Sequence, residues 1–176
     1  MKLGLKKEEV ILVPYEKEWK NEYERVKKEI LNYVNLEPNQ IEHIGSTAIN
    51  GMKAKPIIDI LIGVEQLEEI DKTFYNGLQQ AGFYRLKVER PNEVVCAKFL
   101  DESFEVKTHF IHLVEVNKEK WKQLLFFRDY LNANSDAKIQ YETIKASFFM
   151  TDLKGINAYT DYKEEYVKGI ISKMHS

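Results

Sequence analysis

The chain has 176 residues, of which 44% are hydrophobic and 12% aromatic, enough apolar side chain for the interior of one ordinary domain. Its 26 Lys and Arg against 28 Asp and Glu give a net charge of −2, which argues against a protein devoted to non-specific nucleic-acid binding. The single Cys96 excludes an intramolecular disulfide framework, and neither a signal peptide nor an apolar stretch of about 20 residues is present. We therefore expect a cytoplasmic protein that does not enter a membrane.

The N-terminal third predicts a short strand, a long helix and two further strands. Residues 10–13 are apolar and predict the first strand. From Glu16 to Val34 apolar residues recur every three or four positions, which predicts an amphipathic helix with one face on a core. Strands are expected at Ile41–Ile44 and Ile57–Val64, and the second is apolar enough for the centre of a sheet.

The rest of the chain predicts a helix, three strands and a group of helices. Helical spacing of apolar residues spans Glu65–Ala81, and Gly82 is a natural stop. Tight turns then link three expected strands into an antiparallel meander, at residues 83–89, 94–100 and 104–116. The last expected helices lie at residues 118–133, 137–149 and 157–172.

This order of elements is typical of an α+β domain with one mixed sheet packed by helices. We expect a single domain over residues 1–176, with the sheet in about residues 10–116 and a C-terminal helical group in about residues 118–172.

The segment most informative about function is Gly45-Ser46-Thr47, directly after the strand at Ile41–Ile44. Glycine permits close approach of a phosphate, and the hydroxyls of Ser46 and Thr47 can add hydrogen bonds to it. Asp59 follows on the next strand. This layout resembles that of the nucleotidyltransferase superfamily, in which such a turn holds a triphosphate and carboxylates on adjoining strands hold Mg²⁺.

The amino-acid sequence of these segments resembles the signature of the GrpB family, a branch of that superfamily, and the resemblance extends from about Val10 to Ile171. The matching segments, in chain order, are His43–Ala48, Ala54–Leu61, Thr108-His109 with His112, Phe127–Leu131, Tyr141 with Lys145, and Tyr159-Thr160 with Lys163. The resemblance implies a nucleotidyltransferase-like fold and a nucleotide or other phosphorylated small molecule as ligand. It also implies transfer of a nucleotidyl group with a divalent metal, Mg²⁺ or Mn²⁺, to an acceptor that the sequence does not identify.

The chain departs from the usual carboxylate pattern of such enzymes. Their acids lie two residues apart on one strand, where they share a face. Here Ile57 and Leu61 occupy both positions two away from Asp59. The family pattern also has histidine where this chain has Phe110, and arginine where it has Lys107, so the bidentate phosphate geometry of arginine is lost.

A substitute carboxylate would have to come from the strand at residues 104–116. Strict alternation places Glu105, Lys107 and His109 on one face, which we expect to be the open, ligand-binding face. Asp59, Glu105 and His109 are therefore the candidate catalytic and metal-binding residues, with histidine favouring Mn²⁺ or Zn²⁺ over Mg²⁺. The alternative is that these are charges on a half-exposed strand, and His112 is expected to be a hydrogen-bonded core histidine.

Several basic side chains are candidates for binding phosphate or nucleotide. Lys145 and Lys163 each follow a tyrosine by four residues, so ring and ammonium share a helix face. The alternatives are a strand-end histidine at His43, a solvated Lys55, a structural salt bridge at Arg128, and packing of lysine stems on aromatic rings. The full candidate set is His43, Gly45, Ser46, Thr47, Lys55, Lys107, Arg128, Lys145 and Lys163.

Three functions stay open on the sequence alone. The first is a metal-dependent nucleotidyltransferase that uses Ser46, Thr47 and Asp59. The second is a non-catalytic nucleotide-binding or regulatory module that retains the phosphate turn. The third is an interaction domain in which the turn is only a tight connection. The missing second acid counts against the first function, and the hydrogen-bond donors of the turn count against the third.

Overall fold

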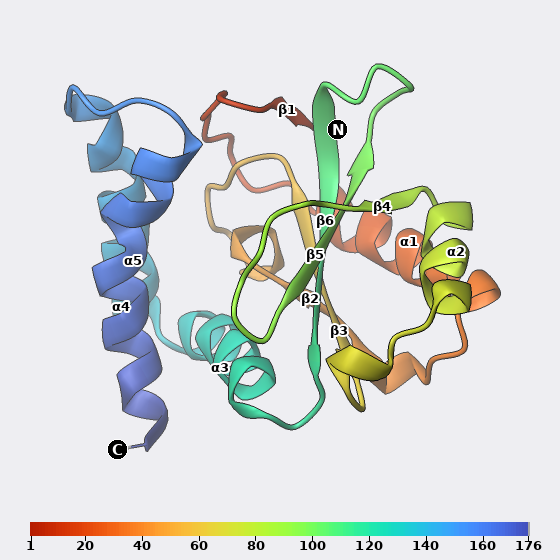
Figure 1. Ribbon diagram of the computed structural model, residues 1–176. Helices are drawn as coiled ribbons and strands as arrows, with labels where there is room; N and C mark the ends of the chain where they lie inside the picture. The colour runs from red at the N-terminus through yellow and green to blue at the C-terminus, as the bar shows by residue number, and fades with distance from the viewer. Residues whose placement is uncertain (176) are drawn as a thin grey trace.

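A computed structural model describes residues 1–175, in which one mixed β-sheet carries helices on both faces (Figure 1). Five strands follow the order β2–β3–β6–β5–β4, and β1 pairs with the start of β6. Strands β3 and β6 are parallel, and the other pairs are antiparallel. The strand bounds are β1 Leu5–Lys6, β2 Ile41–Ile44, β3 Ile58–Val64, β4 Phe83–Arg85, β5 Val94–Phe99 and β6 Val106–Glu115.

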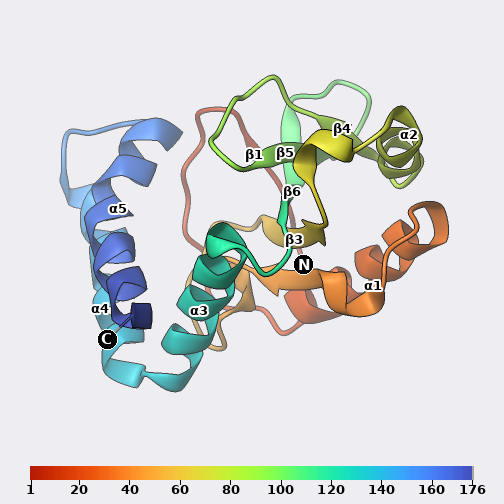
Figure 2. The same ribbon diagram turned by 60° about the horizontal axis from the view of Figure 1, so that its bottom comes forward.

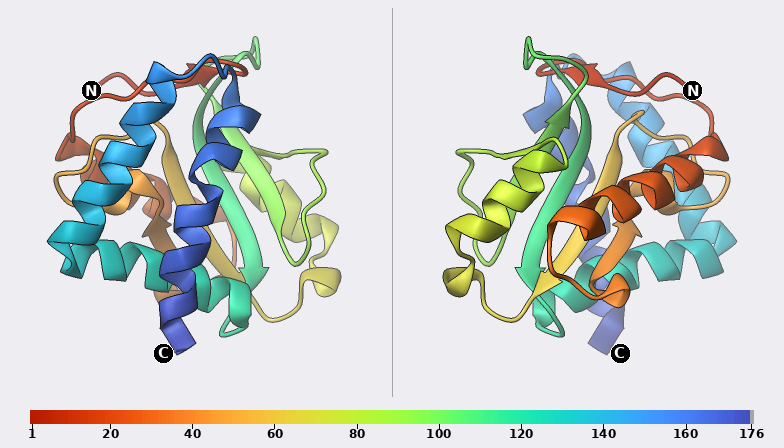
Figure 3. Two further views of the ribbon diagram at one scale, coloured as in Figure 1. Left: turned by 90° about the vertical axis from the view of Figure 1, so that its left-hand side faces the viewer. Right: turned by 90° about the vertical axis from the view of Figure 1, so that its right-hand side faces the viewer.

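The α-helices fall into two groups on opposite sides of the sheet (Figure 3). Their bounds are α1 Glu18–Tyr33, α2 Lys72–Gln80, α3 Glu119–Ala133, α4 Ser135–Ser147 and α5 Ile156–Ser172. Helices α1 and α2 cover one face, and the three C-terminal helices lie on the other side. The α+β class with a C-terminal helical group is thus confirmed. No helix within residues 1–175 is long and apolar enough to cross a membrane.

The larger core lies between α1 and the sheet. The apolar stripe of α1, spaced by three and four residues, is buried against alternate residues of β3. The stripe consists of Trp19, Tyr23, Val26 and Ile30, and its partners on β3 include Ile58, Ile60 and Ile62. The helix and the central strand expected from the sequence are both confirmed.

On the opposite face the C-terminal helices make two separate contacts. Trp121 of α3 packs directly on the sheet, against Ile44 and Leu61. Helices α4 and α5 instead pack on α3 and on the segment that follows the Gly-Ser turn, where Ile49 and Met52 are fully buried. Figure 2 shows α3 between the α4–α5 pair and the sheet. The α4–α5 pair is therefore held at a distance from the sheet.

Three expected elements differ in the structure. Residues 10–13 form no strand but only a single bridge between Val13 and Ala54, and the N-terminal strand is instead Leu5–Lys6, paired with β6. Helix α2 begins at Lys72, since the Asp71 carboxylate accepts a hydrogen bond of 2.8 Å from the Phe74 N–H and caps it there. Strand β4 ends at Arg85, four residues earlier than the expected strand.

Candidate functional site

The Gly-Ser turn lies against the end of β3. In the antiparallel β2–β3 pair, Ile44 is the register partner of Asp59, so Gly45 follows directly beside the aspartate. Gly45 has φ +72°, and a Cβ built on it would lie 2.5 Å from Asp59 Oδ2. Any larger residue would meet both a strained backbone and the carboxylate. Glycine is therefore required here for Asp59 to sit under the turn.

A cavity of about 750 Å³ opens between this turn, the sheet and α5. Its size suits a small-molecule ligand. Its walls include Ser46, Thr47, Asp59 and Phe110. Six Lys or Arg side chains line it against three Asp or Glu, which favours an anionic ligand. The cations are Lys6, Lys7, Lys55, Arg90, Lys107 and Lys163, and the acids are Glu9, Asp59 and Asp161.

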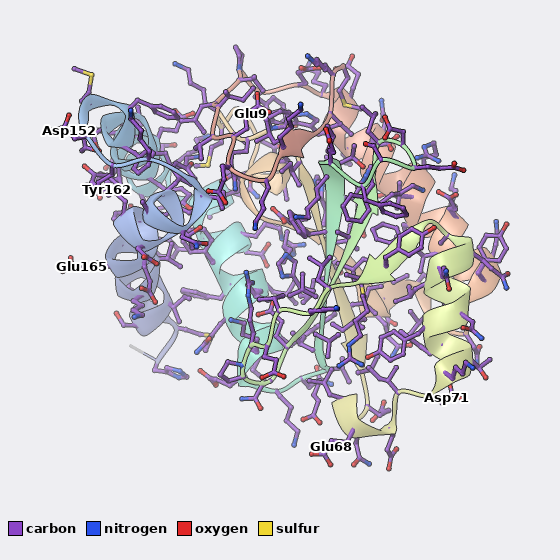
Figure 4. The ribbon with its side chains drawn as sticks, turned by 45° about the horizontal axis from the view of Figure 1, so that its top comes forward. Glu9, Glu68, Asp71, Asp152, Tyr162 and Glu165 are labelled. Atoms are coloured by element: carbon purple, nitrogen blue, oxygen red, sulfur yellow. The ribbon has the colours of Figure 1, made fainter. Side chains whose placement is uncertain are left out.

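Helix α5 turns one side of its surface toward this cavity. Tyr159 and Lys163 line the cavity, whereas Tyr162 and Glu165 lie on the outer side of α5 (Figure 4). Figure 4 also shows Glu9 on the N-terminal segment, and Glu9 is another residue of the cavity lining. The helix spacing of Tyr159 and Lys163 therefore places ring and ammonium together at the cavity wall.

Two lysines lie against one tyrosine ring at this wall. Lys55 Nζ lies 5.4 Å from the centre of the Tyr159 ring, and Lys163 Nζ lies 4.9 Å from it. Burial and the neighbouring Lys163 charge lower the pKa of Lys55 to about 8, and burial also lowers the pKa of Lys163. A bound phosphate would relieve this repulsion between like charges.

Lys145 lies behind the turn rather than in the cavity. Its side chain is 1% exposed, and Nζ donates hydrogen bonds to Ser46 Oγ at 3.3 Å and to the Lys53 carbonyl at 2.5 Å. Burial lowers the pKa of Lys145 to about 7. Lys145 thus connects α4 to the Gly-Ser turn and fixes the position of the Ser46 hydroxyl.

His43 and Arg128 support the turn from the other side. His43 stacks on Tyr23 with ring centres 4.8 Å apart, and its Nε2 lies 3.0 Å from Thr47 Oγ1. Burial lowers the pKa of His43 to about 4, so the ring is neutral. Arg128 donates hydrogen bonds to the Glu42 carboxylate at 2.7 Å and to the His43 carbonyl at 2.9 Å. Both residues match the structural alternative considered for them, and neither lines the cavity.

Three side chains on neighbouring segments of the sheet, Asp59, His112 and Glu93, are linked by hydrogen bonds. His112 Nε2 lies 3.3 Å from Asp59 Oδ1, and His112 Nδ1 lies 2.5 Å from Glu93 Oε1. Burial opposes protonation of His112, but the two carboxylates outweigh it and raise its pKa to about 9. Lys120 and Arg90 contact Glu93 in turn, at 3.6 and 3.4 Å. His112 thus lies at the cavity rather than in the core as expected, and Glu93, which precedes β5, belongs to no sequence motif that could have predicted its contact with His112.

The prediction that Asp59, Glu105 and His109 lie on one face of the sheet is wrong. Asp59 pairs with Phe110 across the parallel strands, so His109 points to the opposite face, where its Nε2 lies 3.2 Å from Glu22. Burial lowers the pKa of His109 to about 4. The Glu105 side chain is 64% exposed and lies 3.6 Å from Lys6.

Two features of β6 are responsible: its parallel register with β3 places His109 on the opposite face from Asp59, and its pairing with β5 is irregular. Lys98 pairs with His109 and Phe99 with Lys107, so Thr108 is skipped and strict alternation fails there. Lys107 and Phe110 consequently both line the cavity. The proposed metal ligands are not brought together, and no three His, Cys, Asp or Glu side chains within residues 1–175 gather around a metal position.

Residues 9–173 match the protein family described as GrpB protein. The chain belongs to the GrpB family. It is 38% identical over 173 residues to the glutamate-rich protein GrpB of Alkalihalophilus pseudofirmus, covering 98% of this chain and 99% of that one. It is 30% identical over 162 residues to the UPF0157 protein YqkA of Bacillus subtilis, covering 92% of this chain and 46% of that one.

Solved structures support the nucleotidyltransferase-like fold. The crystal structure of GrpB from Enterococcus faecalis has a TM-score of 0.77 at 24% identity, covering 94% of this chain and all of that one. A structure of the Cid1 poly(U) polymerase with bound MgGTP has a TM-score of 0.52 at 16% identity, covering 76% and 43%. At these identities the likeness concerns the fold alone, and it agrees with the fold expected from the Gly-Ser turn.

Proposed function

We propose that this GrpB-family chain binds a phosphorylated small molecule, with a nucleoside triphosphate as the first ligand to test. The observation that carries the proposal is that the Gly45-Ser46 turn and two lysines from distant segments line one cavity. Within the described residues, neither Lys55 nor Lys163 forms an ion pair with a carboxylate. Asp59 is the nearby carboxylate that acts on both lysines, and one carboxylate against two half-buried ammonium groups leaves a net positive charge, which favours an anion that arrives as ligand.

Each group has a separate task in this proposal. Lys55 and Lys163 neutralise phosphate oxygens as point charges. Ser46 Oγ accepts a hydrogen bond from Lys145 and also hydrogen-bonds the Tyr141 side chain, so its hydroxyl is held at the cavity wall, where it can reach a phosphate oxygen. Gly45 has no side chain that would separate this phosphate from Asp59. The lysines therefore supply the electrostatic attraction, and the turn fixes the orientation.

Transfer of a nucleotidyl group is the second candidate function. The observation in its favour is Asp59, which lies on β3 beside the turn. The residues around it do not fit the protein-held two-metal site of such enzymes, because Leu61 is buried in the core and Glu105 and His109 point elsewhere. The geometry thus supports binding better than transfer, and we derive no metal-dependent step.

The test is thermal unfolding of the protein with nucleoside triphosphates, in EDTA and then in Mg²⁺. A ligand at about 100 times its dissociation constant stabilises a protein by about 2.7 kcal/mol, which is about 5–11 °C for a chain of this size. We expect a shift in EDTA that Lys55→Met and Lys163→Met reduce. Lys168→Met is the matched control, since Lys168 is 71% exposed and pairs with Glu164.

Two outcomes would redirect the proposal. A shift that requires Mg²⁺ and disappears in Asp59→Asn would favour the transferase over the binding module. If no triphosphate, pyrophosphate or coenzyme A precursor shifts the unfolding temperature, the proposal is contradicted. The interaction domain is then the remaining candidate function.

We also expect the affinity for a phosphate ligand to fall as the pH rises through about 8. The pKa of Lys55 is lowered to about 8 in the free protein, and an anion binds its protonated form. Above that pKa each unit of pH should weaken binding by about tenfold for each lysine that must take up a proton. Calorimetric titration between pH 7 and 9.5 measures this, and Lys55→Met should flatten the profile. An affinity that is constant or rises over this range would contradict the assignment.

A further inference from the structure

We propose that Ser46 is a nucleophile that accepts an acyl group, with Lys145 as the base that removes its proton and Tyr141 as the residue that orients its hydroxyl. Ser46 lines the cavity, so a ligand can reach it, whereas Lys145 lies behind it and is 1% exposed. Lys145 and Tyr141 both come from α4 and both contact the Ser46 side chain. A serine beside a base, with a third group that orients it, is the general arrangement of an activated nucleophile.

The hydrogen-bond partners of Lys145 fit an amine better than an ammonium. Nζ lies 3.3 Å from Ser46 Oγ and 2.5 Å from the Lys53 carbonyl oxygen, and within residues 1–175 no carboxylate forms an ion pair with it. A buried ammonium has three N–H groups to satisfy and requires a counter-charge. An amine donates one N–H to the Lys53 carbonyl, and its lone pair accepts the proton of the Ser46 hydroxyl.

The groups that face Lys145 agree with this protonation state. Burial is the main cause that lowers the pKa of Lys145 to about 7, and the positive charges of Lys163 and Lys55 lower it as well. The Glu142 carboxylate acts in the opposite direction. About half of the Lys145 side chains are therefore amines at neutral pH, and the fraction increases as the pH rises.

Tyr141 determines where the Ser46 proton points. Burial raises the pKa of Tyr141 above its ordinary range, so Tyr141 stays a phenol, and it hydrogen-bonds the Ser46 side chain. When the phenol donates to Ser46 Oγ, the proton of Ser46 is left for Lys145. The Tyr141 ring is itself fixed, since it stacks on Tyr166 and meets Phe127 edge-on, with ring centres 5.6 and 5.3 Å apart.

The class of acyl donor follows from the charges of the cavity and rests on the proposed function. Lys55 and Lys163 favour a phosphorylated group, so the donor is an acyl phosphate. Ser46 Oγ bonds to the carbonyl carbon, and the bond from that carbon to the phosphate oxygen breaks. The hydroxyl proton passes to Lys145 and then to the leaving phosphate. Water hydrolyses the resulting serine ester, so one acyl phosphate and one water give one carboxylic acid and one phosphate.

The first experiment treats the whole protein with phenylmethanesulfonyl fluoride, which carries no phosphate, and locates the adduct by mass spectrometry. We expect one adduct, on Ser46, that Ser46→Ala abolishes. Between about pH 5.5 and 8.5 the rate should rise with pH and level off above about 7, as Lys145 loses its proton. An unmodified wild type, or an adduct on another serine, would overturn the nucleophile.

Variants of Lys145 distinguish a base from a structural contact. A general base contributes about 10²–10⁴-fold to the rate, and Lys145→Met should lose that much. Lys145→Arg keeps hydrogen-bond donors but stays protonated, so it should react as slowly. Ser147→Ala is the control, because Ser147 is also on α4 but its Oγ donates to the Ile144 carbonyl, and its rate should equal that of the wild type. A wild-type rate that does not change with pH would overturn the base even if neither Lys145 variant folds.

Acetyl phosphate tests the class of donor. We expect hydrolysis that Ser46→Ala abolishes and that Lys55→Met slows by about tenfold or more. If Ser46 reacts with the sulfonyl fluoride but the wild type does not hydrolyse acetyl phosphate, the acyl phosphate assignment is overturned. Thermal shifts with triphosphates measure phosphate binding separately, so an unreactive Ser46 does not imply failure of the proposed function.

Discussion

Replacing Gly45 with alanine should lower the free energy of unfolding substantially. A strained backbone alone costs about 1–3 kcal/mol, and we expect the loss to exceed that. Gly45 has φ +72°, and its new Cβ would lie 2.5 Å from Asp59 Oδ2 and 3.1 Å from Asp59 Cβ. The carboxylate and the turn cannot both keep their positions. Phosphate binding should fall with stability, since Ser46 follows directly. Urea denaturation measures the loss of stability, and calorimetry measures the loss of binding.

Gly51 provides the matched control for this prediction. It has φ +75°, but nothing lies within 4 Å of a Cβ built on it. Gly51→Ala therefore has the backbone strain without the clash, and it should cost less than Gly45→Ala. In an Asp59→Ala background the cost of Gly45→Ala should drop toward that of Gly51→Ala. Equal costs for both glycines in the wild-type background would show that Asp59 does not lie under the turn.

Replacing Gly77 with alanine is the second change with a large expected effect. Gly77 is buried in α2, and a Cβ there would overlap sterically with the Tyr33 carbonyl oxygen at the end of α1. Backbone atoms cannot move aside as a flexible side chain can, so we expect a loss of about 1–3 kcal/mol or more. Circular dichroism during urea denaturation measures this loss.

Gly169 is the control for Gly77, because it also lies within a helix. Nothing lies within 4 Å of its added Cβ in α5, so Gly169→Ala should stabilise the protein by about 0.5–1 kcal/mol. The two changes add the same atom to a helix and should have opposite signs. A Gly77→Ala protein as stable as the wild type would contradict the close packing of α1 on α2.

The spacing of residues along the sequence was sufficient to predict three features of the structure, each of which depends on residues close together in the chain. The stripe of α1 recurs at helical spacing and is buried as expected. The strand–turn–strand segment around Gly45 is short, so the position of Asp59 beside the turn follows from chain connectivity. The Tyr159 and Lys163 pair shares a helix face because four residues make about one turn.

The arrangement of β6 could not be predicted in this way. A skipped residue at Thr108 has no clear signal in a single sequence, and it moves Lys107 and Phe110 onto the same side. The parallel register of β3 with β6, in which Asp59 pairs with Phe110, brings His112 to the cavity and His109 to the α1 face. Glu93 reaches His112 only because β5 pairs antiparallel with β6, a contact between residues nineteen positions apart. Tertiary pairing, rather than composition, determines these contacts.

The central claim is that phosphate binds between the Gly-Ser turn and the lysines of the cavity. A crystal structure with a non-hydrolysable nucleoside triphosphate tests this most directly. We expect phosphate oxygens within hydrogen-bond distance of Ser46 Oγ and of Lys55 Nζ or Lys163 Nζ. A triphosphate bound elsewhere on the protein, with these three side chains free of it, would contradict the account.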